Sequence, residues 1–312
     1  MARTWTAPSL AGARAGAGDR RITIEADDDP RDLTFRPAGP ASAATLTAEQ
    51  VEQFNAQGYL GGLRVIDGAD LDGLRAYIDG LVTAVVSAPD RRNSYSIINY
   101  QLVCRGLYDL ARTPAILDCV ADVIGPDIVC WNTHVFSKPP RDAMAVPFHQ
   151  DGVYWPLTPA RTVTVWLAVD DADEGNAAMR FVAGSHRFGP IPHEEKALDG
   201  TRTLKHQALD PERYGPVRTN ELAAGEMSLH SDLLLHGSPP NGSDRRRAAV
   251  TLRYAAAEVA ALPGAEWYLG PAIHCRGVVP DRWPDRRRPT SEHPELMAHV
   301  WGDVDGVPRD EA

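Results

Sequence analysis

Apolar residues repeat at helical spacing through the first part of the chain that looks ordered. Thr47 and Gln50 have the spacing of a capping box, and Gly58 is well placed to end the helix that they begin. No strand-like pattern stands out before residue 128, so three helices are expected to precede the first strand of the body. They are predicted from Thr47 to about Gln57, from Leu71 to the residue before Pro89, and from Pro114 to near Gly125.

From Ile128 onward the period changes to two, which indicates half-buried strands. Clusters of Gly, Pro, Asn and Asp separate the alternating runs, as is typical of a sandwich or barrel and not of a βαβ repeat. The strands are predicted at Ile128–Phe136, Arg161–Val169, Met227–Leu235 and Arg247–Ala255.

The pattern divides the chain into an extension and one domain. Residues 1–44 are rich in Ala, Gly, Pro, Arg and Asp, and only Arg21–Glu25 alternates, so we expect a partly disordered N-terminal extension. Residues 45–312 are expected to form a single domain. Within it, an inserted loop is predicted at about 189–216 and a loop-rich tail from about residue 262.

Composition excludes several classes of protein. Of the 312 residues 43% are hydrophobic and 24% charged, which permits a packed core, and the net charge of −10 argues against a nucleic-acid partner. The sequence contains no run of eighteen apolar residues, so it predicts no membrane-spanning helix. The first residues lack the apolar centre of a secretory signal, and the four cysteines lack a CxxC pair. We therefore expect a cytoplasmic protein.

Candidate chemistry begins at His149 and Asp151, which are two residues apart and would share one face of a strand. A hydrogen-bonded surface pair is the plain alternative, because such a spacing is common by chance. His236, in the sequence LLLHGSPPN, adds a second imidazole. Two imidazoles and one carboxylate form the facial triad that leaves coordination positions open on non-haem iron.

Arg247 lies eleven residues after His236, at the start of an alternating run. A guanidinium can hold a carboxylate through two parallel hydrogen bonds, which suits the far end of a dicarboxylic acid. A solvated turn is the alternative, and it is the better interpretation for Arg245 and Arg246.

Three stretches, PFHQDGVYWPL, VWLAVDDADEGNAAMRFVAGSH and LHSDLLLHGSPPNGSDRRRAAVTLRY, carry a resemblance. Within Leu46–Tyr254 the chain resembles the phytanoyl-CoA dioxygenase (PhyH-like) branch of the iron(II)- and 2-oxoglutarate-dependent oxygenases. The resemblance implies a mainly β fold with flanking helices, a double-stranded β-helix (jelly roll) of cupin-like type. It also implies that His149, Asp151 and His236 bind iron and that Arg247 binds the C5 carboxylate of 2-oxoglutarate.

Other residues are weaker candidates for the site. The resemblance places Asn132 and Ser238 near the cosubstrate and Trp155 in the pocket wall. His134 shares a predicted strand face with Asn132, so that contact with substrate and packing are equally open for it. Arg180 is a candidate partner of an anionic substrate, with surface charge as its alternative. His230, six residues before His236, would share its face on one strand; it is interpreted as a structural histidine of the barrel, with a role next to the metal ligands as the alternative.

The activity implied by the resemblance is oxidation of a small molecule, with specialised metabolism as the expected setting. Iron(II), 2-oxoglutarate and O₂ are the expected cofactor and cosubstrates, with succinate and CO₂ as products. Asp151 fills the position that a halide takes in related halogenases, which favours hydroxylation. Two other functions stay open: a cupin-like metal enzyme that does not use 2-oxoglutarate, and a non-catalytic small-molecule binding protein.

Overall fold

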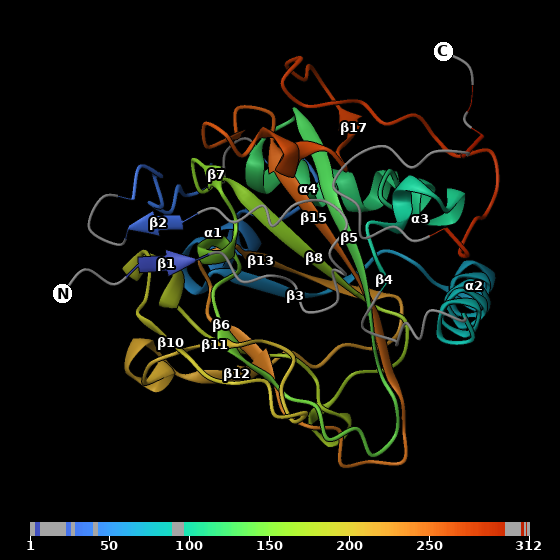
Figure 1. The fold of residues 1–312 in the computed structure, drawn as a ribbon, viewed down its shortest axis with the longest axis horizontal. Coiled ribbons are helices and arrows are strands. Elements are labelled where there is room, and N and C mark those ends of the chain that lie inside the picture. The colour runs from blue at the N-terminus through green and yellow to red at the C-terminus, as the bar shows by residue number, and fades with distance from the viewer. Residues whose placement is uncertain are drawn as a thin grey trace.

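The computed structural model of the chain describes residues 29–39, 43–88 and 97–296, residues 307, 308 and 310, and two short strands near the N-terminus. These strands, β1 (Thr4–Thr6) and β2 (Thr23–Glu25), pair in antiparallel fashion (Figure 1). The alternation at Arg21–Glu25 therefore did indicate a strand. Most of the remaining residues of the predicted extension lie outside the described part of the chain.

A seven-stranded antiparallel sheet forms the centre of the molecule (Figure 1). In spatial order the strands are β17 (Ile273–Arg276), β5 (Ile128–Lys138), β15 (Arg247–Ala256), β8 (Thr162–Ala168), β13 (Glu226–Ser231) and β3 (Tyr59–Arg64), and β4 (Ile97–Ile98) also pairs with β5. The longest strands of this sheet, β5, β8 and β15, are those that the alternating runs predicted. Nearly all their residues are buried, which explains their apolar sequences.

A four-stranded antiparallel sheet is the second layer. Its strands are short, in the order β12 (Val217–Thr219), β9 (Arg180–Val182), β14 (His236–Ser238) and β6 (Val146–His149). With the helices outside the larger sheet, the two antiparallel sheets confirm the prediction of a mainly β, jelly-roll fold with flanking helices. Two further antiparallel pairs join β10 (His193–Glu195) to β11 (His206–Ala208) and β7 (Leu157–Thr158) to β16 (Ala260–Ala261).

The three predicted helices are confirmed as α1 (Ala48–Gln57), α2 (Gly68–Val86) and α4 (Pro114–Ile124). Thr47 and Gln50 form the capping box that begins α1, and Gly58, with a φ of 81°, ends it. The expectation that no strand lies among the helices was wrong, because β3 follows α1 directly. Its sequence, YLGGLR, contains two glycines and becomes a strand by pairing with β13. A short helix, α3 (Arg105–Leu110), was also not predicted.

The apolar core lies mainly between the helices and the outer face of the larger sheet. α4 packs against β5, β8 and β15, and Ile116, Val165 and Leu252 are fully buried there. A second cluster, which includes Trp166 and Phe181, lies between the two sheets. The inner face of the larger sheet carries polar side chains beside this cluster, and this is the face that meets the smaller sheet.

The predicted strand Met227–Leu235 is in fact one strand followed by a turn. β13 ends at Ser231, whose backbone carbonyl accepts a hydrogen bond from Leu234 N at 3.0 Å and whose hydroxyl accepts one from Leu233 N at 3.2 Å. After this turn β14 begins in the other sheet. Leu233, Leu234 and Leu235 are each fully buried in a different apolar cluster, so alternation could not mark the break.

The insertion and the tail are less irregular than expected. Residues 189–216 contain the β10–β11 pair and a 3-10 turn at Pro211–Tyr214, and the tail from residue 262 contains β17 and the buried Trp283. Ahead of the domain, the guanidinium of Arg31 donates hydrogen bonds to the carbonyls of Gly152 and Trp155. Within the described ranges, no helix is both long enough and apolar enough to cross a membrane.

Candidate metal centre

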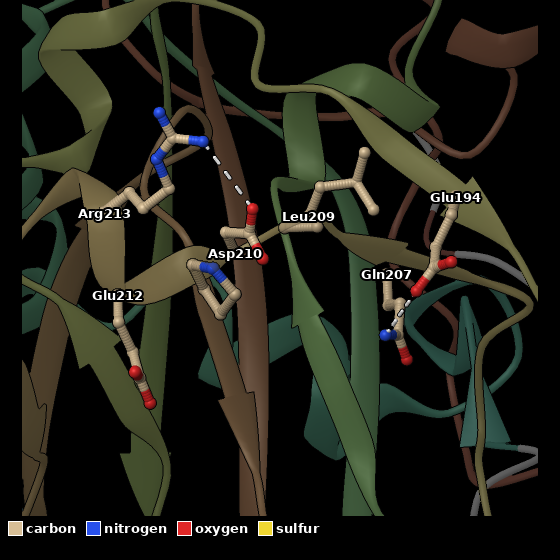
Figure 2. A pocket seen from close by; sticks show the side chains of 8 residues that line it. Glu194, Gln207, Leu209, Asp210, Glu212 and Arg213 are labelled. Carbon is tan, nitrogen blue, oxygen red and sulfur yellow. Dashed lines mark hydrogen bonds and ion pairs between the residues drawn. The ribbon is translucent and has the colours of Figure 1, made fainter.

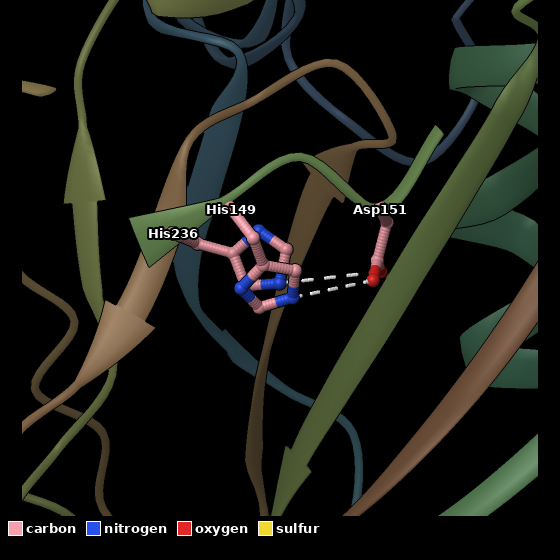
Figure 3. Close-up of side chains that lie close together, drawn as sticks. All are labelled: His149, Asp151 and His236. Atoms are coloured by element: carbon pink, nitrogen blue, oxygen red, sulfur yellow. Dashed lines mark ion pairs between the residues drawn. The ribbon is translucent and has the colours of Figure 1, made fainter. Parts of the chain in front are cut away.

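Three side chains from the smaller sheet and the turn after it converge on one point (Figure 3). His149 is the last residue of β6 and His236 the first of β14, and these two residues are direct neighbours across the strands. Asp151 opens the 3-10 turn that follows β6, so His149 and Asp151 do not share one strand as expected. Their ligand atoms all lie within 4.8 Å of one another, and all three residues are buried.

Backbone carbonyls fix the tautomer of both imidazoles. His149 Nδ1 lies 2.8 Å from the carbonyl oxygen of Pro147, and His236 Nδ1 lies 3.0 Å from that of Leu234. A ring nitrogen that faces a carbonyl must donate its hydrogen, so each Nε2 keeps its lone pair. The two Nε2 atoms lie 3.6 and 4.0 Å from oxygens of Asp151, beyond hydrogen-bonding distance.

The surroundings of the triad keep the carboxylate of Asp151 ionised and the imidazole of His236 neutral. Burial alone would raise the pKa of Asp151, but the charge of the nearby Arg253 guanidinium holds it well below its usual range. Burial and the neighbouring His149 lower the pKa of His236 to about 4. The centre therefore offers two imidazole nitrogen donors and one anionic oxygen donor.

This donor set fits iron(II). Two imidazoles and one carboxylate on one side of a metal leave the opposite positions open, which is the arrangement of non-haem iron(II) oxygenases. Hydrogen bonds from the outer ring nitrogens to carbonyls are the usual support of metal-binding histidines. His149, Asp151 and His236 are thus the residues that would hold the metal.

Four strands of the larger sheet place one residue each in a row beside Asp151. In register these are Asn132 (β5), Arg253 (β15), Thr164 (β8) and His230 (β13). Direct neighbours across antiparallel strands project from the same face. Thr164 Oγ1 lies 3.4 Å from Asp151 Oδ2, so the row faces the triad.

Arg253 connects this row to the metal ligands. Its Nε lies 3.5 Å from Asp151 Oδ2, and one terminal N–H donates to Asn132 Oδ1 at 2.6 Å. The amide of Asn132 in turn donates to Asn99 Oδ1 at 2.7 Å. Asn132 therefore lies in the row beside the triad, where its side-chain oxygen accepts a hydrogen bond from Arg253.

Arg247 lies further along the same face. It is buried, its neighbour across the strands is Lys138, and its guanidinium lies 5.3 Å from the ring centre of Trp166. Ser238 is also buried, two residues after His236, and no described residue makes a hydrogen bond with its hydroxyl. A buried cation and a free hydroxyl on the two facing sheets are suited to hold a carboxylate.

The weaker candidates differ in where the structure places them. Trp155 is buried, and the Arg253 guanidinium lies 5.5 Å from its ring centre. His134 is on the inner face opposite Thr251 and stacks on Phe136. Arg180 does not join the triad: Phe181, not Arg180, is the direct neighbour of His236, so Arg180 projects from the opposite face, towards Glu174.

Arg253 and Thr164 lie beside the triad but are not among the candidate site residues expected from the sequence. Arg253 is six residues after Arg247 and Thr164 is two before Trp166, so alternation already placed each pair on one strand face. His230 was placed on the strand of His236, which is wrong, since the two lie in different sheets. Nevertheless their ring centres are only 4.7 Å apart.

The insertion packs beside the centre. Gln150, between two of the ligands, is buried and its amide bonds the backbone of Gly189, Ile191 and Leu233. The hydroxyl of Tyr154, whose ring lies edge-on to that of His149, donates to the carbonyl of His206 at 3.2 Å. These contacts attach residues 189–216 to the strand that carries His149.

A cavity of about 490 Å³ lies within the insertion (Figure 2). It is lined by polar and charged side chains that pair with one another, Gln207 with Glu194 and Arg213 with Asp210. It shares no lining residue with the triad, and so it is separate from the candidate metal centre.

Comparison with known proteins gives consistent matches. The family model described as Phytanoyl-CoA dioxygenase (PhyH) matches residues 54–249. A probable alpha-ketoglutarate-dependent hypophosphite dioxygenase from Stutzerimonas stutzeri is 32% identical over 171 residues, 53% of this chain and 58% of that protein. Human peroxisomal phytanoyl-CoA dioxygenase is 24% identical over 235 residues, 68% of this chain and 69% of that protein. This chain spans about half the length of several curated relatives, for example 50% of a probable phytanoyl-CoA dioxygenase from Caenorhabditis elegans.

Solved structures agree with this fold. A non-heme monooxygenase, ThoJ, in its apo form has a TM-score of 0.64 and 28% sequence identity, over 77% of this chain and 88% of that one. The alpha ketoglutarate-dependent epimerase SnoN, at 19% identity and a TM-score of 0.60, shares the fold.

Proposed function

This chain belongs to the phytanoyl-CoA dioxygenase (PhyH) family, and on that premise we propose that it is an iron(II)- and 2-oxoglutarate-dependent oxygenase of a small molecule. The family expected from the sequence motifs is confirmed. One observation supports the activity most: His149, Asp151 and His236 meet with the Nδ1 of each imidazole turned to a backbone carbonyl and with Asp151 as an anionic donor. With iron(II) and O₂ bound, this centre would oxidise a C–H bond of substrate while 2-oxoglutarate becomes succinate and CO₂.

The cosubstrate would lie along the inner face of the larger sheet. Arg247 and Ser238, both buried, would hold its C5 carboxylate, and a metal bound by the triad would take its 2-oxo acid end. Arg253 and Thr164 keep the carboxylate of Asp151 in place. Trp166 beside Arg247 and the apolar cluster around it exclude water, which strengthens each of these polar contacts.

The substrate would enter from the side of the smaller sheet. Tyr154 lies against His149 and is bonded to the insertion, so residues 189–216 are part of the proposed substrate pocket. A free small molecule of specialised metabolism is the substrate class that we propose. Asp151 retains its carboxylate, which favours hydroxylation or a related oxidation over halogenation.

An anaerobic titration tests this function. The metal-free protein receives iron(II), then 2-oxoglutarate, and the visible metal-to-ligand charge-transfer band is recorded. We expect the band to form and Arg247→Ala to weaken it. Iron binding without a band would favour the cupin-like enzyme that does not use 2-oxoglutarate. Failure to bind iron would favour the non-catalytic binding protein.

A further inference from the structure

We propose that His230 is a cosubstrate-binding residue, whose imidazole donates a hydrogen bond to the metal-proximal, 2-oxo acid end of 2-oxoglutarate. The inference rests on the proposed function and adds a residue to it. It replaces the interpretation of His230 as a histidine that only packs in the barrel.

His230 lies in the site although it is in the other sheet from the metal-binding histidines. It is the direct neighbour of Thr164 across β13 and β8, and Thr164 in turn is the neighbour of Arg253. Both neighbours contact Asp151, so the His230 side chain projects from the same face as theirs. Its ring centre is 4.7 Å from that of His236 and 5.3 Å from that of Phe181.

Both ring nitrogens of His230 are buried and lack a hydrogen-bond partner in the structure. A neutral imidazole has one N–H donor and one acceptor, and buried groups of this kind are nearly always paired. The other three buried histidines of the described chain, His149, His186 and His236, each bond a backbone carbonyl. His230 is therefore the exception, and a ligand is the natural partner for its free nitrogens.

The position of Arg247 identifies which ligand this is. Its guanidinium lies over Trp166, and Trp166 is the neighbour of Ser228, two residues before His230 on β13. A dicarboxylic acid held by Arg247 at one end and the metal at the other would run along β8 and β13. Its 2-oxo acid end then reaches the row of His230. His230 is not part of the ligand cluster, so it would bind the acid and not the metal.

A residue that only packs and one that binds a ligand differ in their effect on stability. His230→Phe fills the same space against Phe181 and removes two unpaired buried nitrogens. If His230 binds the cosubstrate, the metal-free variant should have the same melting temperature as the wild type or a higher one. If His230 stabilises the core by packing, the variant should have a lower melting temperature.

The experiment compares His230→Phe, His230→Gln and the control His186→Phe in three assays: melting temperature without metal, iron(II) affinity, and the anaerobic charge-transfer titration with 2-oxoglutarate. For His230→Phe we expect about tenfold weaker 2-oxoglutarate binding, unchanged iron affinity and no loss of melting temperature. His230→Gln keeps an N–H donor and should recover most of the binding.

His186→Phe is the matched control because His186 is equally buried, yet bonds Asn55 O at 3.0 Å and packs against Phe35. It should lower the melting temperature and leave 2-oxoglutarate binding unchanged. Should His230→Phe not fold, the smaller His230→Leu takes the same test. Unchanged 2-oxoglutarate affinity in the folded apolar variant overturns the inference. A wild-type protein that binds iron without forming the band overturns the proposed function instead.

Discussion

The two sheets that enclose the metal centre are built on different scales. In the larger sheet, β5 and β15 have 11 and 10 residues, and β15 pairs along its length with β5 and β8. In the smaller sheet, β6 has 4 residues and β14 has 3. His149 and His236 come from the short strands of the smaller sheet, whereas Arg247, Arg253 and His230 come from the larger sheet.

This difference indicates that the two sheets have separate roles, the larger in binding 2-oxoglutarate and the smaller in binding the metal. Long paired strands hold side chains at fixed intervals, which suits a site that must span the length of 2-oxoglutarate. The short strands need only direct two imidazole rings to one point. The backbone carbonyls two residues before each histidine and the buried amide of Gln150 hold them in place. We therefore expect substitutions to fall into three groups: those that lower iron(II) affinity, those that lower the free energy of unfolding, and those that lower 2-oxoglutarate affinity.

The largest effect is expected in the smaller sheet. His236→Ala, like His149→Ala or Asp151→Ala, should abolish measurable iron(II) binding and turnover, because two donors are too few to hold the metal. The fold should survive, as judged by circular dichroism, since the larger sheet is untouched. Full activity in any one of the three variants would contradict the assignment of the triad.

A core substitution in the larger sheet should lower the stability of the protein and leave metal binding unchanged. Leu252 is fully buried on the face that meets the helices. Leu252→Ala should lower the free energy of unfolding by about 2–5 kcal/mol in a denaturant titration, from lost burial and a cavity. Iron(II) affinity of the folded variant should stay the same. Loss of metal binding in a folded Leu252→Ala would show that the sheets are not separable in this way.

The cosubstrate end of the larger sheet should respond to Arg247→Ala. A charge-assisted contact is worth about 1.5–3 kcal/mol, which predicts a ten- to hundredfold weaker 2-oxoglutarate affinity with iron(II) affinity retained. Arg245→Ala is the control, because Arg245 is exposed and pairs with Asp173. Equal affinities in wild type and Arg247→Ala would move the anchor to Arg253.

The smallest effect concerns Asp232, at the crossing between the sheets. Burial raises the pKa of Asp232 from 3.8 to about 6, although Thr162 and Ser231 donate hydrogen bonds to it. A folded-state pKa above the unfolded one gives stability that is present below pH 4 and lost as the pH rises through 6.

Asp232→Asn abolishes this titration. It should be more stable than wild type by about 1–2 kcal/mol above pH 6, because each pKa unit is worth about 1.4 kcal/mol and the amide accepts fewer hydrogen bonds. Below pH 4 the gain should be lost, and the variant should be less stable than wild type by about 1–2 kcal/mol because of the lost hydrogen bonds. Denaturant titrations of the metal-free pair across pH 3.5–8 measure the difference. A gain that does not depend on pH would show that ionisation of the buried Asp232 carboxyl is not its cause.

Long strands could be predicted from the sequence, and short strands could not. The runs at Ile128–Phe136 and Arg161–Val169 were long enough for alternation to show, and Thr47 and Gln50 marked α1 by their chemistry. The short strands β6, β9 and β14 were not predicted, because three or four residues carry no period. Their metal ligands were nevertheless found, since the type and spacing of His149, Asp151 and His236 carry the signal.

The sequence by itself determined the family, the mainly β fold and the candidate ligands. The reason is that side-chain chemistry and the alternation of apolar and polar residues along a segment can both be read from that segment alone. Only the tertiary structure decided which strands face each other. It ended β13 at Ser231, turned Arg180 away from the triad and brought His230 beside His236 from another sheet. Such contacts depend on which strands pair, and pairing is set by the whole core and not by any one segment.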